Sequence, residues 1–398
     1  MRHRLLFILF TLSLFTIAQG NDEIKNNIIY ENIYSEKLNS YREIQIRLPK
    51  TYDHNKDNYY PVFFVFDGHY LFDLVSGNVD YMSFWKSIPE SIVVGINQTD
   101  SRYNDINVLD NINYTPISST ANFFDFISLE LIPYMNKKYR TTKFRVAVGN
   151  ESTANFINFF LIRKFPIMNG YINISPKYSE NMKERIATYL INSSDEIFYY
   201  VSTSNRDFKT IADNVLDFNK KMDSLKNKNV KYKFNSLNNR LHFNLAAYSI
   251  PEAIENIYSI YDDIDKVEYD SIILKLESSP VKYLEDKYEK IQRIYGLKKE
   301  ISINDFLKIE EYIEETEKFS FFKNLAKLAT INYRETILPS YFMGRFYEHT
   351  GNHRKAIQTY RSAYNLDDFI EISKEYLFQR ANSIADDFGY EKQEYNWN

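Results

Sequence analysis

The amino-acid sequence predicts an α/β domain with a mainly parallel central sheet, followed by an all-helical region. The first observation is a series of short strand-like runs, the earliest of them nearly continuous in apolar residues, at 62–66, 91–96, 144–148, 170–175, 197–202 and 230–234. The second is that helical segments separate these runs, which is typical of a parallel sheet buried on both faces. The third is that strand-like runs stop after about residue 262, where helical periodicity continues to the C-terminus.

The elements around these strands follow from the same periodicities. Residues 27–49 alternate polar and apolar side chains, which predicts an antiparallel hairpin at the edge of the sheet. Apolar residues at helical spacing predict helices over 121–139, 154–165 and about 209–226. We therefore expect the α/β domain to span residues 27–262.

The C-terminal part of the sequence is predicted to be helical throughout. Residues 263–300 are rich in Lys, Glu and Asp and indicate a helical connector, and residues 301–398 indicate helical hairpins. Within the hairpins, small residues and tyrosines stand at spacings of 3, 9, 4 and 3, in the order Gly344, Tyr347, Ala356, Tyr360 and Ala363. Small residues let two helices cross closely, and this spacing resembles a tetratricopeptide repeat. A generic helical hairpin is the alternative.

The composition limits the class of protein and its partners. A chain of 398 residues with 44% hydrophobic residues is long and apolar enough to bury a large core. Its net charge of −4 gives no reason to expect nucleic acid or an anionic membrane as the partner. Cysteine is absent from the sequence, which excludes disulfides, thiol catalysis and a lipid anchor on cysteine.

The first twenty residues have the pattern of a secretory signal peptide. A basic start precedes a short apolar stretch over 5–17, and the small residues Ala18 and Gly20 suit a cleavage site before Asn21. Residues 1–20 are therefore predicted to be removed on export, which leaves a periplasmic or secreted protein with no membrane span. An uncleaved membrane anchor is the alternative.

The chemistry of the chain centres on the turn that follows the 144–148 strand. A strand, a tight turn and a helix form the frame of a nucleophile elbow, whose pattern in an active hydrolase is Gly-x-Ser-x-Gly. Here Gly149 occupies the first glycine position, Glu151 occupies the serine position, and Thr153 replaces the second glycine. The nucleophile position is therefore predicted to hold a carboxylate, and Thr153 is expected to crowd the turn.

Several segments around this turn resemble the esterase family of α/β-hydrolases that includes enterochelin esterases and esterase D. The matching segments, in chain order, are 60–68, 92–97 with Arg102 and Asp105, 126–127, 130–134 with 139–140, and 174–176. Together they cover residues 27 to about 262, and family members with a helical, repeat-bearing tail are similar to this chain over its whole length. The resemblance implies an α/β-hydrolase fold and ester substrates such as siderophores or acylated sugars.

The family's triad runs Ser, then Asp or Glu, then His in chain order, and the resemblance assigns its positions here. The histidine position matches His242, which follows the last predicted strand. The acid position matches Asp207, with Asp213 as the alternative. The oxyanion donors that the family implies are backbone N–H groups of Ser152 and of the Gly68–His69 turn.

Glu151 at the nucleophile position leaves three interpretations open. The favoured one is a catalytically degenerate site, because a carboxylate has no proton for His242 to remove and its charge repels a substrate oxyanion. The second is an active serine-type carboxylic ester hydrolase in which Ser152 is a shifted nucleophile acting with His242. The third is a working carboxylate, as at the corresponding aspartate of haloalkane dehalogenases.

These interpretations predict an exported, esterase-like protein that acts in ligand or protein binding, with the active esterase as the alternative. The former pocket is expected to hold a small-molecule ester or acyl ligand, and the helical tail to offer a groove to a protein partner. No cofactor is expected. No metal site is expected either, since His349 and His353 flank a predicted turn and lack a well-spaced third ligand.

Overall fold

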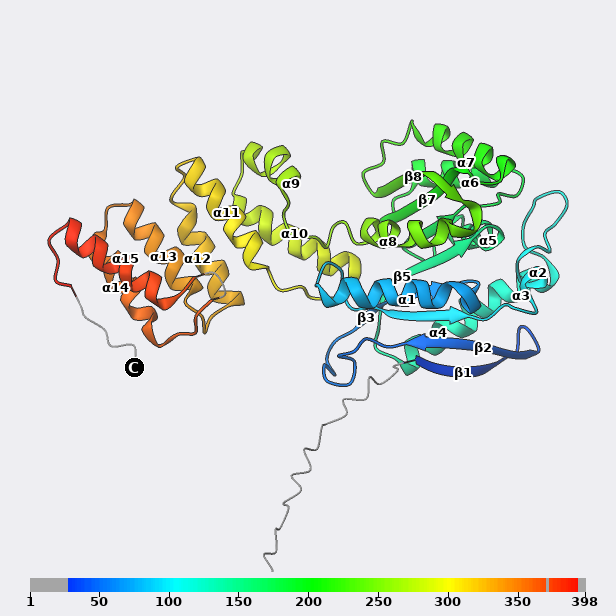
Figure 1. Cartoon of the computed structure of the whole chain (residues 1–398), viewed down its shortest axis with the longest axis horizontal. Coiled ribbons are helices and arrows are strands. Elements are labelled where there is room, and N and C mark those ends of the chain that lie inside the picture. Colours follow the sequence, from blue (N-terminus) through cyan, green and yellow to red (C-terminus); the bar gives the residue numbers. More distant parts are fainter. Residues whose placement is uncertain (1–27, 370–371, 393–398) are drawn as a thin grey trace, which may run out of the picture.

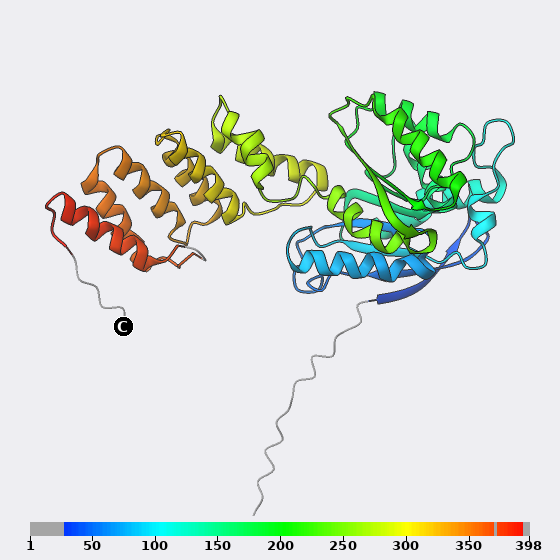
Figure 2. The same cartoon turned by 45° about the horizontal axis from the view of Figure 1, so that its top comes forward.

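The structure, a computed structural model, describes residues 28–369 and 372–392. The predicted signal peptide, residues 1–20, lies outside these ranges. A mainly parallel sheet of eight strands forms the centre of the N-terminal part, and helices cover both of its faces (Figure 1). A helical region follows the sheet and extends away from it in one direction (Figures 1 and 2). The predicted fold class is therefore confirmed.

The sheet has the strand order β1-β2-β4-β3-β5-β6-β7-β8. The pairs β1–β2 and β2–β4 are antiparallel, and the other neighbours are parallel. The central strands are buried along their length because helices lie on both faces. The strand bounds are Ile28–Ser35 (β1), Ser40–Arg47 (β2), Tyr60–Val65 (β3), Ile92–Ile96 (β4), Thr141–Asn150 (β5), Gly170–Ile174 (β6), Ile197–Arg206 (β7) and Val230–Leu241 (β8).

Two helical layers bury the two faces of the sheet. One layer consists of α1 and α8, and the other of α3, the π-helix η1, α4, α5, α6 and α7. The helix predicted over 121–139 is divided here, where Pro133 near the start of α4 lacks the N–H that a regular helix would use. The bounds are Gly68–Phe84 (α1), Arg102–Ile106 (α2), Ser118–Asp125 (α3), Phe126–Leu131 (η1), Ile132–Lys138 (α4), Ser152–Leu161 (α5), Met182–Asn192 (α6), Lys209–Met222 (α7), His242–Asn244 (η2, a 3-10 turn) and Leu245–Ile257 (α8).

The C-terminal helices stack as successive hairpins. Gly344 of α13 lies against the ring of Tyr360 of α14, and a Cβ added at Gly344 would lie 2.1 Å from the ring's Cε1. The close crossing that the small residues predicted is therefore present, while the resemblance to a tetratricopeptide repeat stays a prediction. The bounds are Lys266–Ser271 (α9), Ile273–Lys275 (η3), Pro280–Tyr295 (α10), Ile303–Glu315 (α11), Phe321–Asn332 (α12), Leu338–His349 (α13), His353–Ser362 (α14), Ala363–Asn365 (η4) and Lys374–Asp387 (α15).

An aromatic cluster fastens the helical region to the α/β part. Tyr295 of α10 packs against Phe144 of β5 and against Tyr258, with ring centroids 4.8 Å and 5.2 Å apart. Its hydroxyl donates to the carbonyl oxygen of Ile257 at 2.9 Å. A single buried apolar cluster runs from the sheet through α10 to α15, so both parts share one core.

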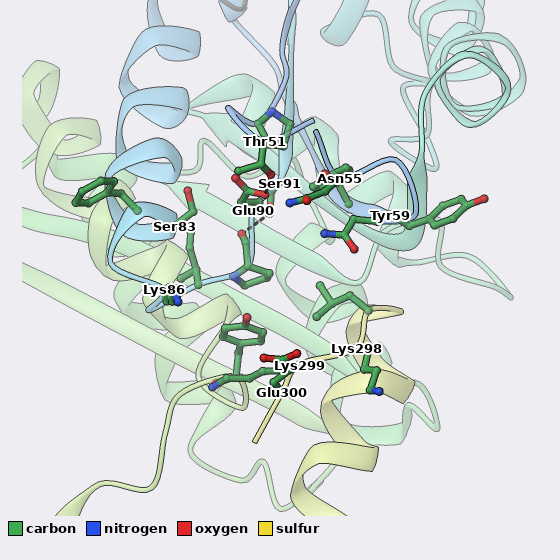
Figure 3. A pocket seen from close by; sticks show the side chains of 18 of the residues that line it. Thr51, Asn55, Tyr59, Ser83, Lys86, Glu90, Ser91, Lys298, Lys299 and Glu300 are labelled. Atoms are coloured by element: carbon green, nitrogen blue, oxygen red, sulfur yellow. Dashed lines mark hydrogen bonds between the residues drawn. The ribbon is translucent and has the colours of Figure 1, made fainter. Parts of the chain in front are cut away.

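A cavity of about 1140 Å³ lies beside this junction, between the α/β part and the first tail helices (Figure 3). The loop before β3, the end of α1 and the loop after α10 contribute to its walls. It lies at the edge of the sheet where the parallel strands begin.

Within the described residues, no helix combines the length and the apolar character that crossing a bilayer requires.

Candidate active site

The predicted site positions converge on the opposite edge of the sheet, where the parallel strands end. Glu151 follows β5, Asp207 follows β7 and His242 follows β8, while α1 and α5 begin at the same edge. Ligand sites of open α/β sheets lie at this edge because the strand ends and helix N-termini leave a crevice there. The sheet topology thus brings together three side chains that are far apart in the sequence.

Glu151 occupies the tip of a sharp turn between β5 and α5. Its backbone, at φ 53° and ψ −109°, is in a region that non-glycine residues rarely adopt. Its N–H donates to the carbonyl of Ile174 and its carbonyl accepts from the N–H of Lys177, both at 3.0 Å. At Gly149, an added Cβ would lie 2.6 Å from the backbone N of Ala154, so the turn requires glycine there. The local geometry is that of a nucleophile elbow.

Thr153 supports this turn, which corrects the expectation that it would crowd it. The side chain is buried, and its hydroxyl donates to Oδ2 of Asp67 at 2.7 Å. The same hydroxyl accepts from the backbone N–H of Asn150 at 2.8 Å. A glycine at position 153 would leave both polar groups without this partner. The strained turn is therefore retained, and the hydroxyl of Thr153 links its backbone to Asp67.

His242 connects Glu151 to Asp207. Its Nδ1 lies 2.6 Å from Oδ1 of Asp207, and its Nε2 lies 3.1 Å from Oε1 of Glu151. The side chains of Asp207 and His242 are 0% and 6% exposed, whereas that of Glu151 is 29% exposed. Because ionised carboxylates only accept hydrogen bonds, His242 makes both contacts at once when both of its ring nitrogens carry a proton.

Three further donors hold the carboxylate of Asp207. The hydroxyls of Ser175 and Thr203 donate to Oδ2 at 2.7 Å and 2.8 Å, and the N–H of Phe208 donates to Oδ1 at 2.7 Å. Such a set of donors stabilises a buried ionised carboxylate. The alternative acid, Asp213, lies on α7, where it pairs with a lysine and its side chain is 58% exposed. The structure thus brings Asp207, and not Asp213, to His242.

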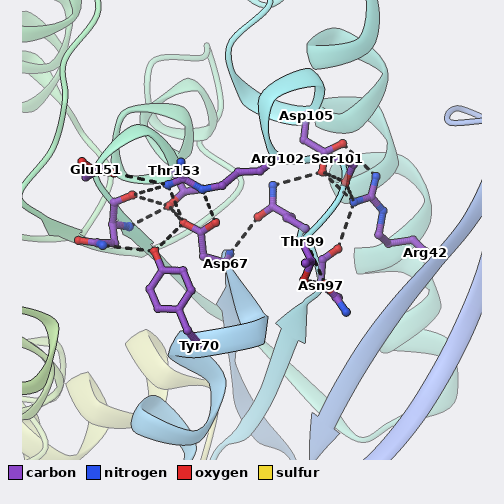
Figure 4. Close-up of polar contacts among 12 residues, drawn as sticks. Arg42, Asp67, Tyr70, Asn97, Thr99, Ser101, Arg102, Asp105, Glu151 and Thr153 are labelled. Carbon is purple, nitrogen blue, oxygen red and sulfur yellow. Dashed lines mark hydrogen bonds and ion pairs between the residues drawn. The ribbon is translucent and has the colours of Figure 1, made fainter. Parts of the chain in front are cut away.

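A second carboxylate, Asp67, anchors the other side of the turn (Figure 4). Arg102 donates to it from Nε at 2.6 Å and from Nη2 at 3.0 Å, and Nη2 also lies 4.0 Å from Oε2 of Glu151. Burial alone would lower the pKa of Arg102, but the hydrogen bonds and charge of Asp67 raise it, with a smaller contribution from Glu151. Burial and the charge of Asp67 raise the pKa of the Tyr70 phenol. Glu151 therefore lies between a histidine and an arginine.

The predicted oxyanion donors are at the starts of two helices. Ser152 is the first residue of α5, and Gly68 and His69 are the first two residues of α1. Backbone N–H groups in the first turn of a helix have no intrahelical acceptor, so they are available to a ligand oxygen. An added Cβ at Gly68 would lie 2.7 Å from the backbone N of Ile96, which fixes glycine at this close approach. Among the described residues, the hydroxyl of Ser152 makes no hydrogen bond with His242.

Two aromatic side chains flank His242, and the sequence did not point to them. The ring of Phe208 lies 4.2 Å from the imidazole and that of Phe243 lies 5.1 Å from it, centroid to centroid. Phe208 is 48% exposed and Phe243 is 85% exposed. Their proximity in sequence to Asp207 and His242 is the only signal that could have indicated them. They give the site an apolar rim beside its polar centre.

The described residues contain no group of three or more side chains that could hold a metal ion. His349 is the last residue of α13 and His353 the first of α14, so the two flank a turn. The ring of His349 stacks on Phe319 with centroids 4.0 Å apart, and that of His353 stacks on Phe388 at 3.5 Å. Both imidazoles therefore serve in packing between tail segments.

A mainly parallel sheet whose strained strand–turn–helix tip faces a histidine and a buried aspartate has the arrangement of an α/β-hydrolase fold. The family model described as "Putative esterase" matches residues 35–175, a span that includes the turn at Glu151. The resemblance to this family that the sequence indicates is therefore confirmed. No curated protein matches the sequence.

Solved structures give the same result for the fold. An uncharacterised protein from Capnocytophaga ochracea is 26% identical, with a TM-score of 0.78, and the match covers 90% of this chain and 99% of that one. An IroE-like serine hydrolase from Shewanella oneidensis is 19% identical, with a TM-score of 0.55 and coverage of 76% and 98%. The BES protein from Bacillus cereus is also 19% identical, with a TM-score of 0.51 and coverage of 61% and 98%. The last two comparisons concern the fold alone.

Proposed function

We propose that this chain is an exported binding protein with an esterase fold, and that it does not hydrolyse esters through a serine nucleophile. Its pocket at the end of the parallel strands binds an ester or acyl ligand, and its helical tail contacts a protein partner. The observation that carries the proposal is the contact between Oε1 of Glu151 and Nε2 of His242, 3.1 Å apart at the tip of the turn.

The chemistry of a carboxylate at this tip opposes ester hydrolysis. A serine would give its proton to His242 and attack the ester carbonyl. The ionised carboxylate of Glu151 instead accepts a hydrogen bond at the same contact, so it has no proton for His242 to remove. Attack by the carboxylate would expel an alkoxide and leave a mixed anhydride, which is less stable than the ester. Its negative charge also opposes the oxyanion that the helix N-termini would otherwise stabilise.

Ser152 offers no substitute nucleophile in this arrangement. It is the first residue of α5, one position beyond the tip, and its hydroxyl forms no hydrogen bond with His242 among the described residues. A serine nucleophile needs that hydrogen bond to lose its proton. His242 is already engaged by Glu151 on one nitrogen and by Asp207 on the other. These contacts support the loss of the serine mechanism.

The site keeps the features that would bind a ligand. Phe208 and Phe243 present exposed aromatic surface beside His242, which would cover an acyl or aryl group. The N–H groups at the starts of α1 and α5 would donate hydrogen bonds to a carbonyl oxygen of the ligand. Export rests on the signal pattern of residues 1–20, and the tail would offer a partner the extended surface that stacked hairpins provide.

Ester hydrolysis by matched variants tests the loss of catalysis. The chain from Asn21 onward is assayed with p-nitrophenyl butyrate, alongside Glu151→Ser and the double variant Glu151→Ser/His242→Ala. We expect the wild-type protein to match the buffer rate and Glu151→Ser to exceed it by at least about 100-fold, because His242 then acts as a general base. The double variant should return to the buffer rate. Hydrolysis by the wild-type protein that disappears in Ser152→Ala would contradict the proposal.

Ligand binding is tested with the same ester, which the wild-type protein should bind without cleaving. Saturation-transfer NMR should detect p-nitrophenyl butyrate on the wild-type protein and a weaker signal for Phe243→Ala. Phe165→Ala is the matched control, because Phe165 is also strongly exposed, at 74%, but follows the far end of α5. An equal loss of signal in both variants would show that the ester does not bind at the Glu151 site.

A further inference from the structure

The cavity at the junction of the α/β part and the helical region lies outside the Glu151 site. It opens at the edge of the sheet where β3 and β4 begin, whereas Glu151 follows the opposite end of β5. Its volume of about 1140 Å³ exceeds the roughly 300–1,000 Å³ of a typical small-molecule pocket. Figure 3 shows Thr51, Glu90 and Ser91 across the cavity from Lys299 and Glu300. The space is large enough for a ligand of several rings, and a ligand that fills it touches both parts.

Aromatic side chains line the cavity on both of its sides. Phe84, at the end of α1, is 69% exposed, and Tyr59, before β3, is 57% exposed. Tyr333 and Phe369 belong to the tail side of the wall, where their rings pack edge to face with centroids 4.8 Å apart. Exposed rings of this size are costly in water and gain energy when a partner with an apolar face covers them. The ligand must therefore present flat apolar faces.

The remaining lining mixes apolar residues such as Ile88, Leu297 and Ile303 with polar ones, and its charge is nearly balanced. Four lysines and five carboxylates contribute to it, namely Lys50, Lys86, Lys298, Lys299, Asp57, Asp80, Glu90, Asp263 and Glu300. Lys299 donates to Asp263 at 2.7 Å, so part of this charge is already neutralised. Lys50, Lys86 and Lys298 form no ion pair among the described residues, and Asp57 and Glu300, which line the same cavity, form none either. Such a wall offers donors and acceptors together and attracts neither a polyanion nor a polycation strongly.

The main chain around the cavity offers no strand to a peptide. β3 and β4 pair with neighbours on both sides, so neither leaves a free edge for an added strand. A chain of pyranose rings fits the lining, because each ring has an apolar C–H face for an aromatic side chain and hydroxyls for mixed donors and acceptors. We propose that the junction cavity binds a neutral oligosaccharide.

Calorimetric titration of the chain from Asn21 onward tests this assignment, which does not depend on the function proposed for the Glu151 site. The probes are malto-, cello-, xylo-, manno- and chitohexaose, with hexagalacturonate and acidic and basic dodecapeptides for comparison. At least one neutral hexasaccharide should saturate the protein with a Kd below about 5 mM. Phe84→Ala should weaken its binding by about fivefold or more, as expected when one stacking ring is lost.

Two control variants locate the binding. Tyr81→Ala removes a ring on the same helix that is 66% exposed and does not line the cavity, so it should leave the Kd unchanged. Glu151→Ala should also leave it unchanged, which separates this site from the other edge of the sheet. The assignment is overturned if no neutral hexasaccharide binds, if only hexagalacturonate or a peptide binds, or if Phe84→Ala and Tyr81→Ala have equal effects.

Discussion

Exchange of Glu151 for alanine and for glycine measures the backbone strain stored at the turn. A non-glycine residue at φ 53° and ψ −109° costs about 1–3 kcal/mol of folding free energy, which glycine largely avoids. Glycine, however, lowers the free energy of unfolding by about 0.5–1 kcal/mol relative to alanine, because a glycine has more conformational freedom to lose when the chain folds. Both substitutions remove the contact with His242, so this contact cancels in the comparison. We therefore expect Glu151→Gly to be more stable than Glu151→Ala by about 1 kcal/mol.

Urea titration, monitored by circular dichroism, gives the free energies of unfolding of the two variants. Thr188, an exposed residue inside α6, supplies the control pair, where the order should reverse and alanine should exceed glycine by about 1 kcal/mol. If Glu151→Gly were no more stable than Glu151→Ala, residue 151 would hold no strain. The interpretation of this turn as a preserved nucleophile elbow would then be refuted.

Three further predictions concern pH, the tail and the junction. Burial alone would raise the pKa of Glu31, but hydrogen bonds from Lys138 and two neighbouring tyrosines lower it overall; Glu31→Gln should therefore lower the free energy of unfolding by about 1 kcal/mol at pH 7. That difference, measured by urea titration, should vanish as the pH falls through the lowered pKa, and a difference that stayed constant as the carboxyl became protonated would contradict it. Gly344→Ala should lower the free energy of unfolding by about 2 kcal/mol, because the new methyl carbon would lie 2.1 Å from Cε1 of Tyr360. An unchanged denaturation midpoint would disprove the close crossing of α13 and α14. Tyr295→Ala should cost about 3–5 kcal/mol, and calorimetry should show two thermal transitions where the wild-type protein, with its shared core, is expected to show one. One sharp transition in the variant would show that the shared core does not depend on this ring.

Periodicity predicted the strands of the sheet because each buried strand must be apolar on both faces. The run at 144–148 lies inside β5, and the runs at 62–66 and 91–96 overlap β3 and β4, each extending one residue beyond its strand. The end of β8 could not be predicted, because beyond Phe234 the strand becomes polar and partly exposed where it extends past the helical layers. The division of the 121–139 helix was missed because apolar spacing does not distinguish a π-helical turn from a regular one.

The site was predictable where a backbone constraint fixes the residue type. Gly149 and the position of Glu151 follow from the geometry of the turn, whereas Asp207 and His242 were assigned through the family resemblance, with Asp213 left open as the alternative acid. The role of Thr153 was not predictable, because its partner Asp67 is brought near it only by the pairing of β3 with β5. The aromatic rim was missed for a different reason, because exposed phenylalanines have no periodicity that distinguishes a binding surface from a loop.

The central claim is that a carboxylate occupies the position of the nucleophile and that His242 can still activate a serine placed there. A fluorophosphonate probe reacts only with an activated serine, and intact-mass spectrometry with peptide mapping locates the label. The wild-type protein should remain unlabelled, Glu151→Ser should be labelled at residue 151, and Glu151→Ser/His242→Ala should not react. Labelling of the wild-type protein at Ser152 would contradict the account and identify an active serine hydrolase.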